Sequence, residues 1–431
     1  MMYKRITGLA AGLAICLTAM PLCAAAQVQP NPVISRDCPV YSGAGQGSAA
    51  YGNDAYYYSF WSAQVPDYLA YDLSGVPEEQ RRTIDAVFYT TSSYDVIGNY
   101  VSRNQEPSAY TIEVNAAPGG TYPEDGWESV VTVEDNALSS RQHVIDFEGY
   151  QWIRITVTGA DGRDSGSAAI NFDIHDVSDG VTDSWIFFGD SITAGGMHNC
   201  YGTGYATYVS QLDDRYFPIQ ENGGIGGITS TQGKENIDRW LSTFPGKYVS
   251  IAYGTNDAWG NQTGPEGYYE NTVYMIRAVL DAGKVPVLPK IPFATEEGVS
   301  TYLDNYNAVI DRIYEEYPEV VQGPDFESYF REHPDELSDG VHPTSEGYDA
   351  MRQMWAQTMY ERVYSTGESF DPGDVTADGT FGMADVVAMQ KYLVRLGTLK
   401  APECGDMNDD GRLDVLDLTY MKRLLTQTAE R

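Results

Sequence analysis

The chain has 431 residues, of which 20% are charged and 42% hydrophobic, and its formal net charge at pH 7 is -34. So large a negative charge repels phosphate backbones and anionic lipid headgroups, which excludes nucleic acid and a membrane surface as partners. A neutral polysaccharide is not excluded, and 33 tyrosines and 7 tryptophans supply flat faces that can stack on sugar rings. The length suits two sizeable domains and a small one.

Residues 1–26 have the composition of a secretory signal peptide. Two basic residues precede an apolar run that extends to Leu22, and three alanines end the segment at Ala26. Cleavage after Ala26 would release the mature protein outside the cell. Pro21 and the small residues before the cleavage site disfavour a transmembrane anchor, so we expect a secreted protein.

Three cysteines remain in the mature chain, each in a different part of it. Cys38, Cys200 and Cys404 form neither a disulfide framework nor the spacing of a zinc site. A pair between Cys38 and Cys200 stays open at this point, although a buried thiol is the simpler state for each cysteine.

Residues 30–178 have the period of β-strands. Apolar and polar residues alternate over 153–158 and 170–175, and turn sequences such as Pro118-Gly119-Gly120 separate the runs. This pattern predicts an antiparallel β-sandwich. The alternation also places His175 on the polar face of its strand, where we expect it to be solvated.

The stretch 110–158, with Trp127, Glu128 and the strand 152–155, is similar to discoidin-like, galactose-binding β-sandwiches. The resemblance implies that this domain can bind glycan. A rigid sandwich that supports the next domain is an equally weighted alternative, because a fold does not determine a function.

From residue 183 to residue 364 the pattern changes to alternating strands and helices. Strands are expected at 185–188, 248–253 and 285–288, and two of the helices at 271–282 and 301–314. Continuous apolar strands are typical of a parallel sheet that is covered on both faces. We therefore predict an α/β domain whose site lies at the carboxyl ends of its strands.

Four polar motifs follow one another along this domain. They are Gly189-Asp190-Ser191-Ile192-Thr193-Ala194-Gly195, Asn222-Gly223-Gly224-Ile225-Gly226-Gly227, Gly254-Thr255-Asn256-Asp257 and Asp339-Gly340-Val341-His342-Pro343. A serine at a strand-to-loop turn between glycines can present its hydroxyl into a cleft above the sheet. Together the motifs closely resemble those of the SGNH, or GDSL-type, hydrolases, which implies a flavodoxin-like sheet for nearly all of the domain.

The resemblance implies catalytic roles for residues in all four motifs. Ser191 would be the nucleophile, His342 its general base and Asp339 the group that orients the imidazole. The oxyanion hole would consist of the backbone N–H groups of Ser191 and Gly227 and the side-chain amide of Asn256. Each residue also has a structural interpretation as a turn or cap former, but four motifs in order at successive strands favour a site.

Four further residues lie within or near these motifs. We expect Asp190 to be a structural hydrogen-bonding residue, whereas Asp257 is open between a turn former and part of the cleft wall. Trp259 and Tyr201 lie on neighbouring loops, where they either form the floor of a sugar-binding subsite or pack within the loop.

Residues 373–428, which follow a linker at 365–372, contain two copies of a calcium-loop pattern. In each copy oxygen-bearing residues occupy positions 1, 3, 5 and 12 and a glycine occupies position 6, the spacing of an EF-hand type loop. The expected ligands, with Thr380 and Arg412 acting through backbone carbonyls, are Asp374, Thr376, Asp378, Thr380, Asp385, Asp406, Asn408, Asp410, Arg412, Asp414 and Asp417.

A helical pattern follows each loop, and none precedes it. The apolar residues are Val386, Met389, Leu393 and Leu396 in the first pattern and Leu418, Met421 and Leu425 in the second. The combination resembles a type I dockerin, a small all-α module, and implies binding of Ca²⁺ and of a cohesin domain on a scaffolding protein. Thr376 at position 3 and Gly382 at position 9 weaken the first loop.

The sequence thus predicts an extracellular, cellulosome-associated serine esterase that removes acetyl groups from plant cell-wall polysaccharide such as xylan or mannan. The four motifs supply the reaction class, and the dockerin resemblance supplies the substrate class. The serine mechanism needs no metal, so we expect calcium to serve the docking module. The alternatives are a lipase or thioesterase type of acyl hydrolase and a non-catalytic glycan-binding subunit.

Overall fold

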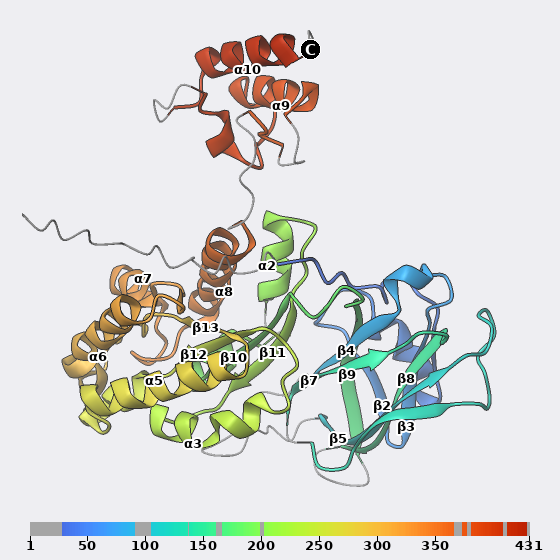
Figure 1. Cartoon of the computed structure of the whole chain (residues 1–431). Helices are drawn as coiled ribbons and strands as arrows, with labels where there is room; N and C mark the ends of the chain where they lie inside the picture. The colour runs from blue at the N-terminus through green and yellow to red at the C-terminus, as the bar shows by residue number, and fades with distance from the viewer. Residues whose placement is uncertain are drawn as a thin grey trace, which may run out of the picture.

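The computed structural model describes residues 28–90, 105–136, 138–160, 166–198, 202–365, 373–376, 381–407 and 412–428. Along the chain these residues form two antiparallel sheets, an α/β domain and a pair of helices (Figure 1). The predicted signal peptide and nearly all of the predicted linker lie outside these ranges. Within them, no helix has the length and apolar character needed to cross a membrane.

The N-terminal part is a β-sandwich, as predicted. One sheet has the strand order β1-β3-β8-β5-β6, and the other has the order β2-β9-β4-β7. The strands are β1 (Val40–Ser42), β2 (Trp61–Gln64), β3 (Asp67–Asp72), β4 (Thr83–Thr90), β5 (Pro107–Asn115), β6 (Glu128–Val133), β7 (Ser140–Asp146), β8 (Trp152–Ala160) and β9 (Ser167–Asp176). Ile112 and Ile155 of the first sheet and Ile84 and Phe172 of the second lie in the shared hydrophobic core.

The expectation that His175 is solvated was wrong. His175 is fully buried, and its Nδ1 lies 2.8 Å from the carbonyl oxygen of Asn31. The N-terminal segment covers this side of β9, because Val33 forms a β-bridge with His175. Burial lowers the pKa of His175 to about 4. Alternation along a strand shows which residues share a face, but it does not show what covers that face.

Cys38 lies in the N-terminal segment that packs against the sandwich. Its Sγ donates a hydrogen bond to the carbonyl oxygen of Ile34 at 3.3 Å. Cys200 lies outside the described ranges, so a pair between Cys38 and Cys200 stays untested.

The central part is a five-stranded parallel sheet with the order β11-β10-β12-β13-β14. Counted within this domain the order is 2-1-3-4-5, which confirms the predicted flavodoxin-like class. The strands are β10 (Ser184–Gly189), β11 (Ile219–Gly224), β12 (Tyr248–Ala252), β13 (Val285–Leu288) and β14 (Val321–Gln322).

Helices cover both faces of this sheet. In Figure 1, α3 and α5 lie on one face and α2 and α8 on the other, and each pair is in contact. The helices are α1 (Ser191–Gly196), α2 (Tyr205–Leu212), α3 (Ser230–Leu241), α4 (Thr255–Ala258), α5 (Pro265–Asp281), α6 (Glu297–Glu316), α7 (Phe326–Glu332) and α8 (Ser345–Met359), with a 3-10 turn η3 (Trp259–Asn261) after α4. The helix predicted at 271–282 corresponds to the C-terminal part of α5, which ends one residue earlier, and the helix predicted at 301–314 is part of α6.

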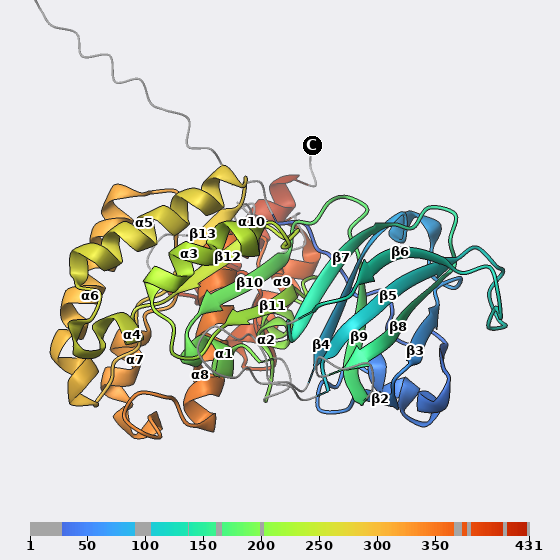
Figure 2. The same ribbon diagram turned by 90° about the horizontal axis from the view of Figure 1, so that it is seen from below.

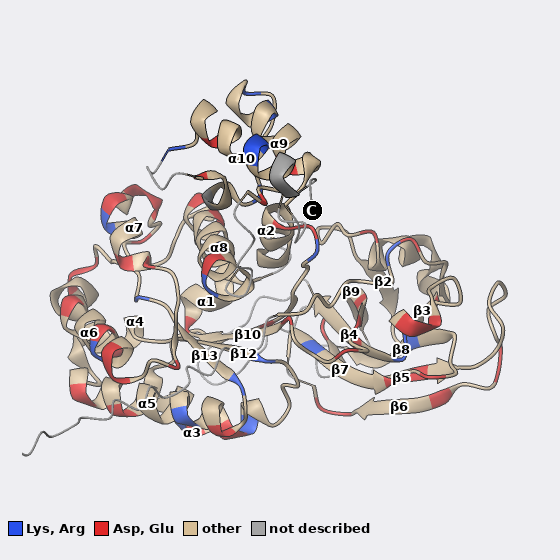
Figure 3. Cartoon of the chain, turned by 45° about the horizontal axis from the view of Figure 1, so that its top comes forward, with Lys and Arg blue, Asp and Glu red and all other residues tan. Residues whose placement is uncertain are grey.

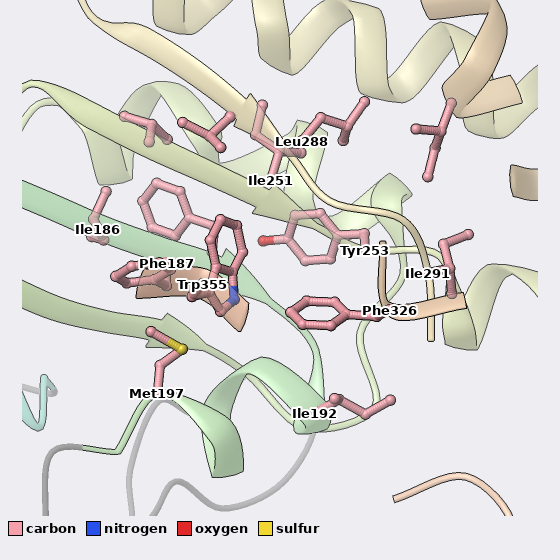
Figure 4. Packing of buried hydrophobic residues seen from close by; sticks show 14 of the residues in the cluster. Ile186, Phe187, Ile192, Met197, Ile251, Tyr253, Leu288, Ile291, Phe326 and Trp355 are labelled. Carbon is pink, nitrogen blue, oxygen red and sulfur yellow. The ribbon is translucent and has the colours of Figure 1, made fainter. Parts of the chain in front are cut away.

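Aromatic side chains join the sheet to α8. Trp185 of β10 stacks on Tyr248 of β12, with ring centroids 4.3 Å apart. Phe187 of β10 contacts Trp355 of α8, which also contacts Phe326 of α7, and Figure 4 shows Trp355 between these two rings. Large buried rings contribute much of the apolar area of a core, so this packing holds α8 and the loop before it against the sheet.

The sandwich and the parallel sheet meet along β7 and β11 (Figure 2). The backbone N–H of Asn222 donates to Ser140 Oγ at 3.0 Å, and Ser184 Oγ donates to Gln142 Oε1 at 2.8 Å. Side chains of the sandwich therefore accept hydrogen bonds from the main chain and a hydroxyl of the α/β domain.

Acidic residues are spread over the outer helices of the α/β domain. Figure 3 shows Asp and Glu along α5, α6 and α7. The negative charge expected from the composition therefore lies on the surface of a folded domain.

The C-terminal part pairs α9 (Met383–Leu393) with α10 (Val415–Thr428), and a 3-10 turn, η6 (Pro402–Gly405), lies between them in sequence. Val386 and Met389 of α9 pack with Leu418 and Met421 of α10 around a small core. These are the residues that the helical spacing predicts on the packed faces.

Leu396 is an exception to that prediction. The helix α9 ends at Leu393, and Leu396 lies beyond it with 78% of its surface exposed. Arg395, with a φ of 60°, turns the chain out of the helix. The expectation for Leu396 was wrong because apolar spacing does not show where a helix stops.

Candidate active site

Ser191 is the first residue of α1 and follows β10 directly. Asp190 caps this helix, since its Oδ1 accepts a hydrogen bond from the backbone N–H of Ile192 at 3.0 Å. Gly189 cannot be a larger residue, because a Cβ there would lie 2.1 Å from Thr193 Oγ1. The sharp turn places Ser191 at the carboxyl end of the strand.

One turn before α8 carries both His342 and Asp339. Asp339 Oδ1 accepts hydrogen bonds from the backbone N–H groups of Val341 at 3.0 Å and of His342 at 2.7 Å. Asp339 Oδ2 lies 2.8 Å from His342 Nδ1. Gly340, with a φ of 84°, provides the left-handed backbone that the turn needs. The imidazole is thereby oriented by its own loop.

The imidazole of His342 also contacts Ser191. His342 Nε2 lies 2.8 Å from Ser191 Oγ. Asp339, His342 and Ser191 thus form a continuous chain of hydrogen bonds. With the carboxylate on the Nδ1 side, Nδ1 carries the proton and Nε2 is the acceptor for the serine hydroxyl, which is the arrangement that activates a serine.

The pKa values of two aspartates at the site, Asp339 and Asp190, are shifted in opposite directions. Burial alone would raise the pKa of Asp339, but hydrogen bonds from the backbone and ring of His342 and from the N–H of Val341 lower it to about 2. The side chains of Asp339 and His342 are 58% and 38% exposed, so the pair lies at a rim that solvent can reach. Asp190 is buried, and burial raises its pKa to about 7. Its capping bond gives it the structural role that we expected.

Gly227 lies on the loop after β11, and Asn256 lies on the short helix α4, which contacts that loop. Asn256 Nδ2 donates to the carbonyl oxygen of Ile228 at 3.0 Å, and Gly227 has a φ of 77°. The structure therefore brings the side-chain amide of Asn256 to the loop that carries Gly227. An amide nitrogen has two hydrogens, and this bond uses one of them.

Two hydrogen-bonding networks that the sequence did not predict support these loops. The buried carboxylate of Asp257 accepts hydrogen bonds from the backbone N–H and the hydroxyl of Ser230, so it links α4 to α3. Asn222 Nδ2 donates to the carbonyl oxygen of Ala194, and its Oδ1 accepts from the N–H of Gly224. The motif position of Asn222 was a signal for this role, whereas nothing in the sequence pointed to Ser230.

The two predicted sugar contacts stay predictions. Trp259 is 44% exposed and lies beside the start of α6, where a Cβ at Gly298 would be 3.1 Å from Trp259 Nε1. Tyr201 lies outside the described ranges.

In the C-terminal part, the buried aspartates of the first loop suit a cation. Asp374 and Asp385, at positions 1 and 12, are fully buried. Asp385 accepts hydrogen bonds from the backbone and hydroxyl of Thr376 and from the N–H of Gly382. Burial would raise the pKa of Asp385, but these hydrogen bonds outweigh it and lower the pKa. Ionised carboxylates that are buried require a positive partner.

The second loop holds its last aspartate in a similar way. Asp417 is fully buried and accepts hydrogen bonds from the N–H groups of Met407 and Asp414. Four of the expected ligands, Asp378, Thr380, Asn408 and Asp410, lie outside the described ranges, whereas Asp406, Arg412 and Asp414 lie within them. Among the residues that are described, no group of three or more His, Cys, Asp or Glu is placed to hold a metal ion.

Comparisons with protein families agree with this division of the chain. Residues 187–350 match the model of the GDSL-like Lipase/Acylhydrolase family, and residues 372–426 match that of the Dockerin type I domain. The chain contains a GDSL-type acylhydrolase domain and a type I dockerin. Both families are those that the four motifs and the paired loops predict.

The chain is also distantly similar to a curated protein. It is 22% identical over 299 residues to a multidomain esterase of Ruminococcus flavefaciens, which is 64% of this chain and 35% of that protein. The chain thus spans about a third of the length of this curated relative.

Solved structures resemble parts of the chain at low identity. An acetylxylan esterase from Geobacillus stearothermophilus is 24% identical and covers 42% of this chain and 94% of its own, with a TM-score of 0.34. A lipase/acylhydrolase from Enterococcus faecalis is 20% identical and covers 41% of this chain and 95% of its own, with a TM-score of 0.36. A Bacillus subtilis protein is 17% identical and covers 68% of this chain and 80% of its own, with a TM-score of 0.40.

Proposed function

We propose that the GDSL-type domain is a serine esterase that removes acetyl groups from plant cell-wall polysaccharide such as xylan or mannan. The observation that carries the proposal is the chain of hydrogen bonds through His342, which is 2.8 Å from Asp339 Oδ2 at one ring nitrogen and 2.8 Å from Ser191 Oγ at the other. Such a chain turns a neutral hydroxyl into a nucleophile.

The reaction proceeds through an acyl-enzyme. His342 Nε2 takes the proton of Ser191 as Oγ attacks the acetyl carbonyl carbon, and the bond between that carbon and the sugar oxygen then breaks. The proton passes from His342 to the leaving sugar oxygen, which leaves an acetyl ester on Ser191. Water then gives a proton to His342, attacks the ester and releases acetate, and Ser191 regains its proton.

The other residues of the site stabilise charges that form during these steps. The carboxylate of Asp339 stabilises the imidazolium form of His342 and keeps its ring oriented. The oxygen of the tetrahedral intermediate receives hydrogen bonds from the N–H groups of Ser191 and Gly227 and from the amide of Asn256. Loss of one such donor costs about a hundred- to a thousandfold in rate.

Two features support a polysaccharide as the substrate. A type I dockerin accompanies the hydrolase domain, and such a module would attach it to an assembly rather than leave it to diffuse alone. The net charge of -34 is compatible with a neutral polymer and not with an anionic lipid surface.

We infer that the dockerin binds Ca²⁺ and a cohesin domain of a scaffolding protein outside the cell. The ligands would be the two sets of loop residues, among which Asp374, Asp385 and Asp417 are buried in the structure. Bound calcium would neutralise these carboxylates and tie each loop to the helix that follows it.

Acetate release from acetylated xylan, mannan and pectin, measured beside hydrolysis of long-chain acyl esters, tests the substrate. We expect kcat/KM on acetylated xylan or mannan to exceed that on long-chain esters by about tenfold or more. A preference for long-chain esters would favour a lipase, and no hydrolysis of either would favour a non-catalytic subunit.

A further inference from the structure

A cleft of about 1010 Å³ lies beside the residues proposed for catalysis. Gly195 of α1 lines it, as do Ser338 and Pro343, which flank Asp339 and His342 in sequence. Tyr58, which belongs to the sandwich, also lines it. The cleft therefore extends from the neighbourhood of the site to the N-terminal part of the molecule.

The volume of the cleft indicates the size of its ligand. Pockets that bury one drug-sized molecule measure about 300–1000 Å³. An acetyl group counted with its ester oxygen has only four heavy atoms. It needs on the order of one tenth of the volume of such a pocket. The cleft of about 1010 Å³ is therefore suited to several linked sugar units rather than to the acyl group alone.

Tyr58 is held in the wall of the cleft by its neighbour Tyr57. The side chain of Tyr57 is buried, and its hydroxyl donates to Asp173 of β9. Its ring also stacks with Phe217 of the α/β domain, with centroids 6.4 Å apart and planes 14° apart. Tyr58 is 52% exposed, so the two neighbouring side chains have opposite environments. Because Tyr57 contacts both the sandwich and the α/β domain, it fixes the position of Tyr58 relative to the cleft.

Tyr58 presents an aromatic surface together with Tyr56. Their ring centroids are 5.3 Å apart, and Tyr56 is 60% exposed. The turn that carries them is closed by Asp54, which accepts hydrogen bonds from the N–H of Tyr56 at 2.9 Å and the hydroxyl of Ser59 at 2.7 Å. An exposed ring that is already held in place loses little conformational entropy when a ligand stacks on it.

Polar side chains of the α/β domain line the same cleft. The carboxylate of Asp349 accepts hydrogen bonds from Tyr208 at 2.8 Å and from Gln353 at 2.9 Å, and Arg352 Nη2 lies 3.2 Å from it. A sugar ring has an apolar face and a rim of hydroxyl groups. The aromatic ring of Tyr58 matches the face, and the carboxylate and amide groups match the rim.

We propose that Tyr58 is a stacking platform for a sugar unit of the polysaccharide chain, so that the sandwich takes part in substrate recognition. This inference rests on the proposed deacetylase function and adds to it a binding residue from outside the GDSL-type domain.

The test compares two substrates in the full chain, the acetylated polysaccharide that the wild type uses and 4-nitrophenyl acetate. Tyr58→Ala should lower the ratio of kcat/KM on the polysaccharide to kcat/KM on the small ester by about tenfold, which is about 1.4 kcal/mol of binding free energy. The loss should appear mainly as a higher KM on the polysaccharide. Tyr58→Phe should keep the ratio, because it keeps the ring.

Tyr51→Ala is the matched control, since Tyr51 is 49% exposed in the 3-10 turn η1 (Ala44–Gly52) of the same segment. It should leave the ratio at the wild-type value. Absence of acetate release from every polysaccharide by the wild type would overturn the proposed function and this inference with it. Release by the wild type with an unchanged ratio in Tyr58→Ala would overturn this inference alone, and an equal loss in Tyr58→Phe would assign the effect to the hydroxyl and refute stacking.

Discussion

At the scale of single residues, Asp339 orients His342 from within the same turn. The carboxylate of Asp339 makes three hydrogen bonds, with the backbone N–H groups of Val341 and His342 and with the ring of His342. These bonds keep its pKa at about 2. A short loop that contains both partners needs no distant element to align them. The remaining requirement, the approach of His342 to Ser191, depends on the packing of α8 against the sheet.

Ser191→Ala should lower kcat by at least about a thousandfold, because it removes the nucleophile and leaves the rest of the site in place. The folded state should be unaffected, as judged by an unchanged Tm. Ser242→Ala is the matched control, since it removes the hydroxyl that donates to the carbonyl oxygen of Arg239 at the far end of α3. Retention of more than a few per cent of the wild-type kcat by the Ser191 variant would remove Ser191 as the nucleophile.

Asp339→Asn should be milder, with a loss in kcat/KM of about a hundredfold. The amide oxygen can still accept from the N–H groups of Val341 and His342, while the negative charge beside the imidazole is lost. Because the pKa of Asp339 is about 2, its carboxylate stays ionised at ordinary assay pH. Any fall in the activity of the wild type that occurs on acidification at a pH above about 4 should therefore also occur in the variant. Its disappearance from the pH profile of kcat/KM would show that Asp339 itself was titrating.

The residues that could be predicted from sequence are those whose partners lie nearby in the chain. Asp190 and Asp339 make their bonds within three residues, and a motif reveals them. Ser230 and Asp257 are 27 residues apart, and His175 is covered by a segment more than 140 residues earlier. Such contacts depend on the tertiary arrangement, which one sequence does not show.

At the scale of elements, the two loops of the dockerin form a natural comparison. Asp385 and Asp417 both occupy position 12, are fully buried and accept a hydrogen bond from the N–H at position 9. Their ligand sets differ, because the second loop has Asn408 at position 3 and Asp414 at position 9 where the first has Thr376 and Gly382.

Asp417→Ala should therefore weaken calcium binding more than Asp385→Ala, by about tenfold or more in apparent Kd. The two changes remove similar capping bonds, so a difference between them reports on the ligand sets. Calcium titration of the full chain, followed by cohesin binding and by far-ultraviolet circular dichroism, measures the effect. An equal or greater loss from Asp385→Ala, or full cohesin binding in chelator, would contradict the assignment.

At the scale of the whole molecule, buried carboxyl groups lie where the sandwich meets the α/β domain. Asp85 of β4 and Glu221 of β11 are buried. Burial raises the pKa of Asp85 to about 7 and that of Glu221 to about 8. Both carboxyl groups therefore stay protonated to a higher pH in the folded protein than in the unfolded chain, where carboxyl pKa values are about 4.

The stability that these neutral carboxyls contribute is present below about pH 4 and is lost as the pH rises through about 7 to 8. We expect the Tm from calorimetry to fall between about pH 4 and about pH 8, the range in which the folded protein holds these protons and the unfolded chain does not. Glu221→Gln should flatten this dependence, whereas Glu319→Gln, at an exposed position, should not. A Tm that falls as steeply in Glu221→Gln as in the wild type would refute the role of Glu221.

The fold class was predictable because apolar runs of strand and helix length alternate from residue 183 to residue 364, and a parallel sheet follows from that alternation. The sandwich was predictable from its period of two. The contact between them was not, because it consists of scattered polar and aromatic residues, such as Ser140 with Asn222 and Tyr57 with Phe217, that no sequence pattern sets apart. For the same reason, the sequence did not indicate that the sandwich reaches the cleft.

The contact along β7 and β11 covers one edge of the parallel sheet. β11 is the outermost strand of its sheet, and hydroxyl groups of Ser140 and Tyr89 on the sandwich accept hydrogen bonds from its N–H groups. With the sandwich removed, these donors would face water along the uncovered edge of a strand that carries one charged residue, Glu221. Such a strand is a template for pairing with another copy of itself. The sandwich therefore protects this edge from pairing with a second copy of the chain. We expect the α/β domain to self-associate when it is expressed without the sandwich.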